Sequence, residues 1–169
     1  MTDPLLLATA PISSKTTGTA NRRTRRTTVY LDTCYIAKFY WNEPNSSQVR
    51  DLVRGANKIH SSAWALAEFH AVLHRRIREG LTTAEEATDL AARFSTHARD
   101  GLWNFVPVNE ALLRRTSLLL ISAPRDIFLR TADAVHLTTA QELGEREIWT
   151  SDRHMLAAAP YFGLTGRSV

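Results

Sequence analysis

Runs of β-branched and aromatic side chains alternate along the chain with longer segments in which apolar residues recur every three or four positions. The strand-like runs cover residues 28–31, 58–60, 102–106 and 148–150. The longer segments between them have the spacing of amphipathic helices. Short strands separated by long helices indicate parallel strands joined by crossover helices. The pattern therefore predicts an α/β fold, a three-layer α/β/α domain with a central parallel sheet.

Capping residues mark the expected ends of the helices. Pro44 ends the first helix, and Asn45 or Ser46 caps the second. Thr82 and Glu85 are expected to form a capping box at the start of the fourth. The expected helices cover residues 35–40, 46–55, 63–78, 82–99, 109–120 and 131–143, followed by a short helix before Pro160.

Length and composition fit one globular domain and locate the positive charge. The chain has 169 residues, of which 44% are hydrophobic and 22% are charged. The formal net charge is +4, and the excess lies in residues 1–27, which carry five basic residues and one acidic residue. This segment is rich in Ser, Thr and Arg, and we expect it to be a flexible extension. The alternative is that translation really starts near Val29. Residues 28–169 are expected to be the folded domain.

The single cysteine and the lack of a long apolar stretch narrow the cellular setting. Cys34 is the only cysteine, which excludes an internal disulfide framework and favours a reducing, cytoplasmic setting. No segment approaches the roughly 20 apolar residues of a membrane span, so no membrane association is expected. Cys34 has no histidine or other base next to it in the sequence, and it is expected to be a buried thiol rather than a nucleophile.

Four acidic residues fall where solvated carboxylates are unusual. Asp32 and Asp152 come at the carboxyl ends of predicted strands, where open parallel sheets place their ligand sites. Glu68 and Asp133 lie within apolar stretches of predicted helices. Each acid taken singly is more readily explained as a helix cap or a paired structural charge. Four together at one end of a sheet repel one another strongly unless a divalent cation lies among them.

The chemistry of these four side chains indicates the type of cation and reaction. Hard carboxylate oxygens without further cysteines favour Mg²⁺ or Mn²⁺ over zinc. A cation held in this way in an open cleft suits phosphodiester hydrolysis, because it activates water and neutralises the charge that develops. The acids are therefore candidates for both metal binding and catalysis.

Other motifs carry weaker signals. His70 and His74 share a helix face at a spacing that zinc can use, but no third ligand accompanies them, and both are expected to be exposed. The tryptophans fall on apolar faces and are expected to lie in the core rather than to stack on ligands. These are Trp41, Trp64, Trp103 and Trp149.

Four motifs together resemble those of PIN-domain ribonucleases, and most closely the VapC toxins of bacterial type II toxin–antitoxin systems. They are V-Y-L-D-T at 29–33, the helical Glu68, R-T-A-D-A-V-H-L at 130–137 and I-W-T-S-D-R-H-M-L at 148–156. The most specific part is the D-A-x-H-L helix followed one strand later by T-x-D. The chain departs from the family pattern in placing its first aspartate at residue 32 rather than close to the start.

The resemblance implies a PIN fold and Mg²⁺- or Mn²⁺-dependent endoribonuclease activity that leaves a 3′-hydroxyl and a 5′-phosphate. It also implies a homodimer, held inactive by a small antitoxin protein whose tail crosses the catalytic groove. By position, Asp32 and Asp133 match the principal metal ligands of the family. Glu68 matches its third acid, and Asp152 matches the fourth, which is more variable.

Two threonines also match the family pattern. Thr33 and Thr150 match hydroxyl positions that lie close to the metal or its water in the family.

The sequence also predicts where RNA binds, and it leaves two other functions open. Because residues 28–169 carry no net charge, RNA affinity is expected from residues 1–27 and from local arginines, namely Arg75, Arg76, Arg78 and Arg153. Two alternatives stay open: a PIN nuclease of RNA processing or DNA repair, and a non-catalytic module that binds RNA or protein.

Overall fold

A parallel sheet forms the centre of the molecule. The computed structural model describes residues 28–169, and the expectations for residues 1–27 lie outside this range. β2 pairs with β1 and β3, β4 pairs with β5, and a bridge between Leu31 and Trp149 joins the two sets in the order β3–β2–β1–β4–β5. The strands are β1 (Thr28–Tyr30), β2 (Lys58–Ser62), β3 (Asn104–Val106), β4 (Glu147–Trp149) and β5 (Thr165–Arg167).

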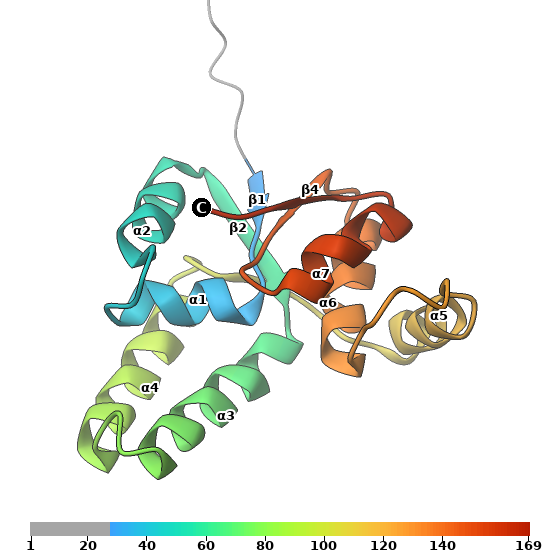
Figure 1. Ribbon diagram of the computed structural model, residues 1–169. Helices are drawn as coiled ribbons and strands as arrows, with labels where there is room; N and C mark the ends of the chain where they lie inside the picture. Colours follow the sequence, from blue (N-terminus) through green and yellow to red (C-terminus); the bar gives the residue numbers. More distant parts are fainter. Residues whose placement is uncertain (1–27) are drawn as a thin grey trace, which may run out of the picture.

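Helices connect the strands and cover both faces of the sheet, with α1 and α2 on one side and α5, α6 and α7 on the other (Figure 1). This arrangement confirms the predicted α/β/α layers and the crossover helices between parallel strands. The helices are α1 (Thr33–Tyr40), α2 (Ser46–Gly55), α3 (Trp64–Arg78), α4 (Ala84–Arg99), α5 (Glu110–Ile121), α6 (Thr131–Glu142) and α7 (Arg153–Ala158), followed by the 3₁₀ turn η1 (Ala159–Phe162).

Two hydrophobic cores lie on opposite faces of β1, because successive side chains of a strand point in opposite directions. Val29 and Leu31 pack in one core with residues of α1, α2, α3 and α4. Tyr30 packs in the other core with residues of α6, α7 and η1. The central strand is therefore buried on both sides, as its continuous apolar sequence predicts.

Several local expectations need correction. The capping box at the start of α4 uses Thr83 and Glu86 rather than Thr82 and Glu85. The sequence T-T-A-E-E permits either register, and in the observed one the hydroxyl of Thr82 also donates to Glu86 (2.9 Å). β5 was not predicted, because T-G-R lacks the apolar residues that mark a buried strand.

The expected core position of Trp64 is also wrong. Its side chain is 39% exposed, at the first residue of α3, where the preceding turn of helix is missing. Trp103 is fully buried, whereas Trp41 and Trp149 are half-buried at the edge of the core.

Gly166 in β5 leaves no room for a side chain against α7. A Cβ atom at this position would lie 3.0 Å from the Cα of Leu156 and 3.1 Å from its carbonyl oxygen. Because these are backbone atoms, they cannot turn aside as a flexible side chain does. We therefore expect Gly166→Ala to lower the free energy of unfolding by about 1–3 kcal/mol, measured by urea denaturation.

Gly55 provides the matched control for this substitution. It is the last residue of α2, and a Cβ there meets no atom within 4 Å. Gly55→Ala should leave stability unchanged or raise it by up to about 1 kcal/mol. Equal stability of the two variants would contradict the argument from crowding.

Candidate active site

A cleft of about 270 Å³ brings the four predicted acids together. Asp32, Glu68, Asp133 and Asp152 all line it, although they come from four separate segments of the chain. It lies where β1 and β4 end, at the carboxyl edge of the sheet. The juxtaposition expected from the sequence is thus present in the fold.

Helix N-termini hold three of the four acids. Asp32 is the N-cap of α1, where its carboxylate accepts a hydrogen bond from the backbone N–H of Tyr35 (3.0 Å). Asp152 is the N-cap of α7, and Asp133 lies in the first turn of α6. The N-terminus of a helix carries a partial positive charge, which favours a carboxylate at these positions. Each helix therefore stabilises the acid that it presents to the cleft.

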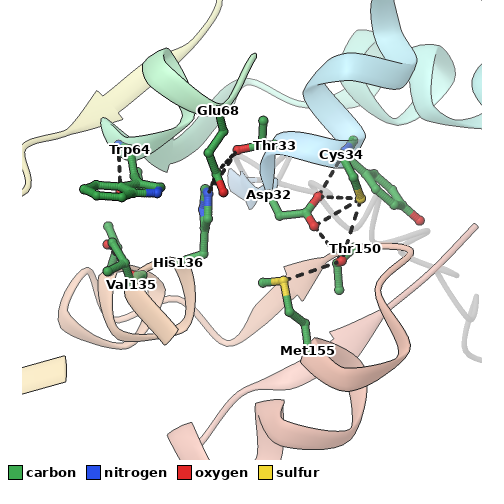
Figure 2. Close-up of polar contacts among 12 residues, drawn as sticks. Asp32, Thr33, Cys34, Trp64, Glu68, Val135, His136, Thr150 and Met155 are labelled. Carbon is green, nitrogen blue, oxygen red and sulfur yellow. Dashed lines mark hydrogen bonds and ion pairs between the residues drawn. The ribbon is translucent and has the colours of Figure 1, made fainter. Parts of the chain in front are cut away.

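Asp32 is the most deeply buried acid, with 4% of its surface exposed. Besides the N–H at the start of α1, its two oxygens accept hydrogen bonds from the hydroxyl of Thr150 (2.6 Å) and the thiol of Cys34 (3.0 and 3.1 Å). Figure 2 shows these three side chains converging. Burial raises the pKa of Asp32, while the hydrogen bonds from Cys34 and Thr150 act in the opposite direction.

Glu68 is held on the other side of the cleft by a chain of side-chain hydrogen bonds. Its Oε2 accepts from the hydroxyl of Thr33 and from Nε2 of the buried His136 (2.9 Å) (Figure 2). Since an ionised carboxylate only accepts, Nε2 carries the imidazole proton. Nδ1 of the same ring lies 3.2 Å from the hydroxyl of Tyr30. Burial opposes ionisation of Glu68, but the hydrogen bond and charge of His136 outweigh it and lower the pKa.

Three of the acids use one oxygen to fix their position and leave the other without a hydrogen bond to residues 28–169. Glu68 uses Oε2, as described above. Asp133 Oδ2 accepts from the backbone N–H of Arg130 (3.2 Å). Asp152 Oδ1 accepts from the backbone N–H groups of His154 (2.7 Å) and Met155 (3.2 Å). The remaining oxygens are Glu68 Oε1, Asp133 Oδ1 and Asp152 Oδ2.

The acids interact electrostatically across the cleft. Burial raises the pKa of Asp133, and the charges of Asp152 and Glu68 raise it further, against the hydrogen bond and charge of Arg130. Within residues 28–169, no three Asp, Glu, His or Cys side chains lie close enough as placed to enclose an ion. Mg²⁺ does not require such a cage, because it commonly retains waters and binds one or two carboxylates. The oxygen-only set of acids and its unrelieved repulsion fit a divalent cation of this type.

Three residues of this cleft were missed or misjudged from the sequence. Cys34 is half-buried and contacts a base, the carboxylate of Asp32, although none adjoins it in the sequence. Burial and the charge of Asp32 raise the pKa of this thiol, so it stays protonated, as expected for a group that is not a nucleophile. His136 and Arg130 also line the cleft. Both lie three residues from Asp133, so helical spacing was the available signal.

The expected RNA-binding arginines differ in their surroundings. Arg75 lines the cleft. Arg76 is occupied elsewhere, since it pairs with Glu43 (2.7 Å) and its guanidinium lies over the ring of Trp41 (4.5 Å). Arg78 and Arg153 are exposed, and the expected exposure of His70 and His74 is confirmed.

Comparisons with known proteins agree with this geometry. The family model described as the PIN domain matches residues 29–160. Ribonuclease VapC46 of Mycobacterium tuberculosis is 32% identical over 138 residues, which covers 80% of this chain and 93% of that protein.

Two solved structures share the fold. The structure of Mycobacterium tuberculosis VapC20, a sarcin–ricin loop cleaving toxin, matches with a TM-score of 0.61 at 19% sequence identity. The match covers 77% of this chain and 94% of the VapC20 chain. The structure of FitAB bound to an IR36 DNA fragment matches with a TM-score of 0.59 at 17% sequence identity. The match covers 83% of this chain and 94% of that chain. The resemblance read from the four motifs is thereby confirmed: the chain belongs to the PIN-domain family and is a VapC-like ribonuclease.

Proposed function

We propose that the protein is a Mg²⁺- or Mn²⁺-dependent endoribonuclease that acts in the cytoplasm as the toxin of a toxin–antitoxin pair. The observation that carries the proposal is the single cleft lined by Asp32, Glu68, Asp133 and Asp152. The 32% identity to ribonuclease VapC46 supports the choice of RNA as substrate. None of the helices in residues 28–169 has the length and apolar character to cross a membrane.

The four acids have distinct proposed tasks. Asp32 and Asp133, with Glu68, hold the first cation, and Asp152 supports a second cation or orients the attacking water. When bound, the cation helps to ionise that water and neutralises charge on the scissile phosphate. The oxygens without hydrogen bonds in Glu68, Asp133 and Asp152 support this assignment, because each is free to accept a cation or a water proton.

The remaining cleft residues position substrate and acids. His136 Nε2–H donates to the carboxylate of Glu68, and the contact of Nδ1 with the Tyr30 hydroxyl (3.2 Å) fixes the orientation of the ring. Arg75 and Arg130 bind phosphates beside the cleft. Asp152 Oδ2 accepts a proton from the water that attacks phosphorus in line. The bond from the water oxygen to phosphorus forms as the P–O3′ bond breaks, and a proton from solvent completes the 3′-hydroxyl, which leaves a 5′-phosphate on the other product.

The proposed partners are an RNA substrate, a small antitoxin protein and a second copy of the chain. The similarity to ribonuclease VapC46 supports the RNA substrate, whereas the antitoxin and the second copy follow from the resemblance to VapC toxins. Growth arrest on expression, relieved by co-expression of a small neighbouring gene product, is the expected behaviour of a toxin. Expression without growth arrest would favour a PIN nuclease of RNA processing or DNA repair.

Loss of the Asp133 charge tests the nuclease directly. Wild-type protein should cut total cellular RNA into discrete products with Mg²⁺ or Mn²⁺ and leave it intact in EDTA. Asp133→Asn should reduce the rate by about 100-fold or more, because it removes a ligand oxygen charge. Product bands resolved on denaturing gels measure the rate.

Asp89→Asn is the matched control for this substitution, since Asp89 is exposed on α4 and does not line the cleft. It should cleave like wild type. Cleavage by Asp133→Asn at the wild-type rate, or wild-type cleavage in EDTA, would contradict the assignment.

The same substitution should stabilise the metal-free protein. The raised pKa of Asp133 means that the folded state binds its proton more tightly than the unfolded state does. Ionisation therefore costs stability as the pH rises above the ordinary aspartate pKa of about 4. In EDTA at neutral pH, Asp133→Asn should raise the melting temperature by about 1–4 °C, and this gain should disappear below about pH 4.

Differential scanning fluorimetry across pH, with and without Mg²⁺, measures both parts of this prediction. Mg²⁺ should raise the melting temperature of wild type more than that of Asp133→Asn, because ligand binding stabilises only the state that binds. A variant that is less stable than wild type in EDTA at neutral pH would rule out unrelieved repulsion at Asp133.

A further inference from the structure

An aromatic pair, formed by the exposed Phe128 and the half-buried His154, has no part in the chemistry described so far. Phe128 is 57% exposed, the most exposed aromatic side chain in residues 28–169. Its ring packs against the imidazole of His154, with centroids 4.7 Å apart and an angle of 57° between the rings. Exposing a phenyl ring of this size forgoes the stability that its burial would supply.

Chain connectivity places this aromatic pair at the rim of the cleft. Phe128 comes two residues before Arg130, and His154 comes two residues after Asp152. Arg130 and Asp152 both line the cleft. Two residues span at most about 7 Å, so the backbone of Phe128 lies close to that of Arg130 and the backbone of His154 close to that of Asp152.

We infer that Phe128 and His154 form a stacking platform for an unpaired base of the RNA, next to the phosphate that is cleaved. The inference rests on the proposed function and narrows its substrate class to single-stranded or looped RNA. Unstacked bases of such RNA bind to the faces of aromatic and histidine rings. In a duplex, the base faces are already covered by neighbouring base pairs.

The charges around the platform favour a nucleic acid over a protein segment. Arg75 and Arg130 line the same cleft, and neither forms an ion pair with another residue of the described chain. Their guanidinium groups are therefore available for phosphates beside the acids. An aromatic surface next to unpaired arginines is the combination that single-stranded nucleic acids require.

A hydrogen bond from Arg153 prepares the imidazole for stacking. Arg153 Nε lies 3.3 Å from His154 Nε2, and a guanidinium only donates, so Nε2 accepts. This bond holds the imidazole in place beside Phe128. The platform orders one base, while the neighbouring arginines bind the backbone.

Substitutions at Phe128 separate stacking from simple apolar contact. Phe128→Leu keeps an apolar side chain but removes the aromatic face, and Phe128→Tyr keeps the face. The probe is a fluorescein-labelled oligoadenylate in EDTA, followed by fluorescence anisotropy. Phe128→Leu should weaken binding about tenfold, within the roughly 5- to 100-fold that loss of one base stack produces, and Phe128→Tyr should bind like wild type.

Two controls identify the part of the RNA that Phe128 contacts. An abasic ribose–phosphate strand of the same length should bind wild type and Phe128→Leu equally, whereas Arg130→Ala should weaken binding of both strands. Leu81→Ala removes another exposed apolar side chain, 59% exposed between α3 and α4, and should leave both affinities unchanged.

The outcomes distinguish this inference from the proposed function. Equal oligoadenylate affinity of wild type and Phe128→Leu, or no binding by wild type, overturns the platform. A change in oligomeric state or in antitoxin binding with RNA affinity intact also overturns it and makes Phe128 a protein contact. Metal-dependent cleavage by the same wild-type preparation shows whether the nuclease proposal stands in either case.

Discussion

Four carboxylates at one end of a sheet repel one another and lose hydration, and the surrounding residues are arranged to offset both costs. Helices α1, α6 and α7 present their N-termini to the cleft. The hydroxyls of Thr33 and Thr150 donate to Glu68 and Asp32. This compensation is incomplete, because the pKa values of Asp32 and Asp133 remain raised. Burial of both acids, and at Asp133 also the charges of Asp152 and Glu68, leave a free-energy cost that a bound cation would relieve.

In three of the four carboxylates, hydrogen bonds fix one oxygen and leave the other available. Glu68, Asp133 and Asp152 are each oriented through one oxygen by a histidine or by backbone N–H groups. Asp32 differs, since both of its oxygens accept hydrogen bonds in the buried floor of the cleft. Such orientation reduces the reorganisation needed when a cation or a substrate enters.

Much of this architecture could be predicted from the sequence, because it depends on short-range signals. The apolar runs located β1, β2, β3 and β4, and their order along the chain led to the parallel sheet. The four acids were found because Asp32 and Asp152 follow predicted strands, and Glu68 and Asp133 lie within apolar stretches of predicted helices. In contrast, β5 is held by pairing with β4 rather than by apolar side chains, so no local pattern marks it.

The parts of the site that could not be predicted depend on contacts between distant segments. The bond between Cys34 and Asp32 needs the geometry of the first turn of α1, and the bond between His136 and Glu68 joins residues of α6 and α3. Composition identified arginines but not their partners, so the pairing of Arg76 with Glu43 was not expected. Sequence patterns identify which residue types are present, whereas the fold determines which of them meet.

The position of Tyr30, between the hydrophobic core and the cleft, limits how this protein can be engineered. Its ring is fully buried in the core beneath α6, and its hydroxyl meets the imidazole that holds Glu68. One side chain at the end of a three-residue strand thus belongs to the hydrophobic interior and also contacts the histidine that lines the acidic cleft. Repacking that interior for thermal stability would shift the geometry of the cleft, so robustness and turnover cannot be optimised independently along this strand.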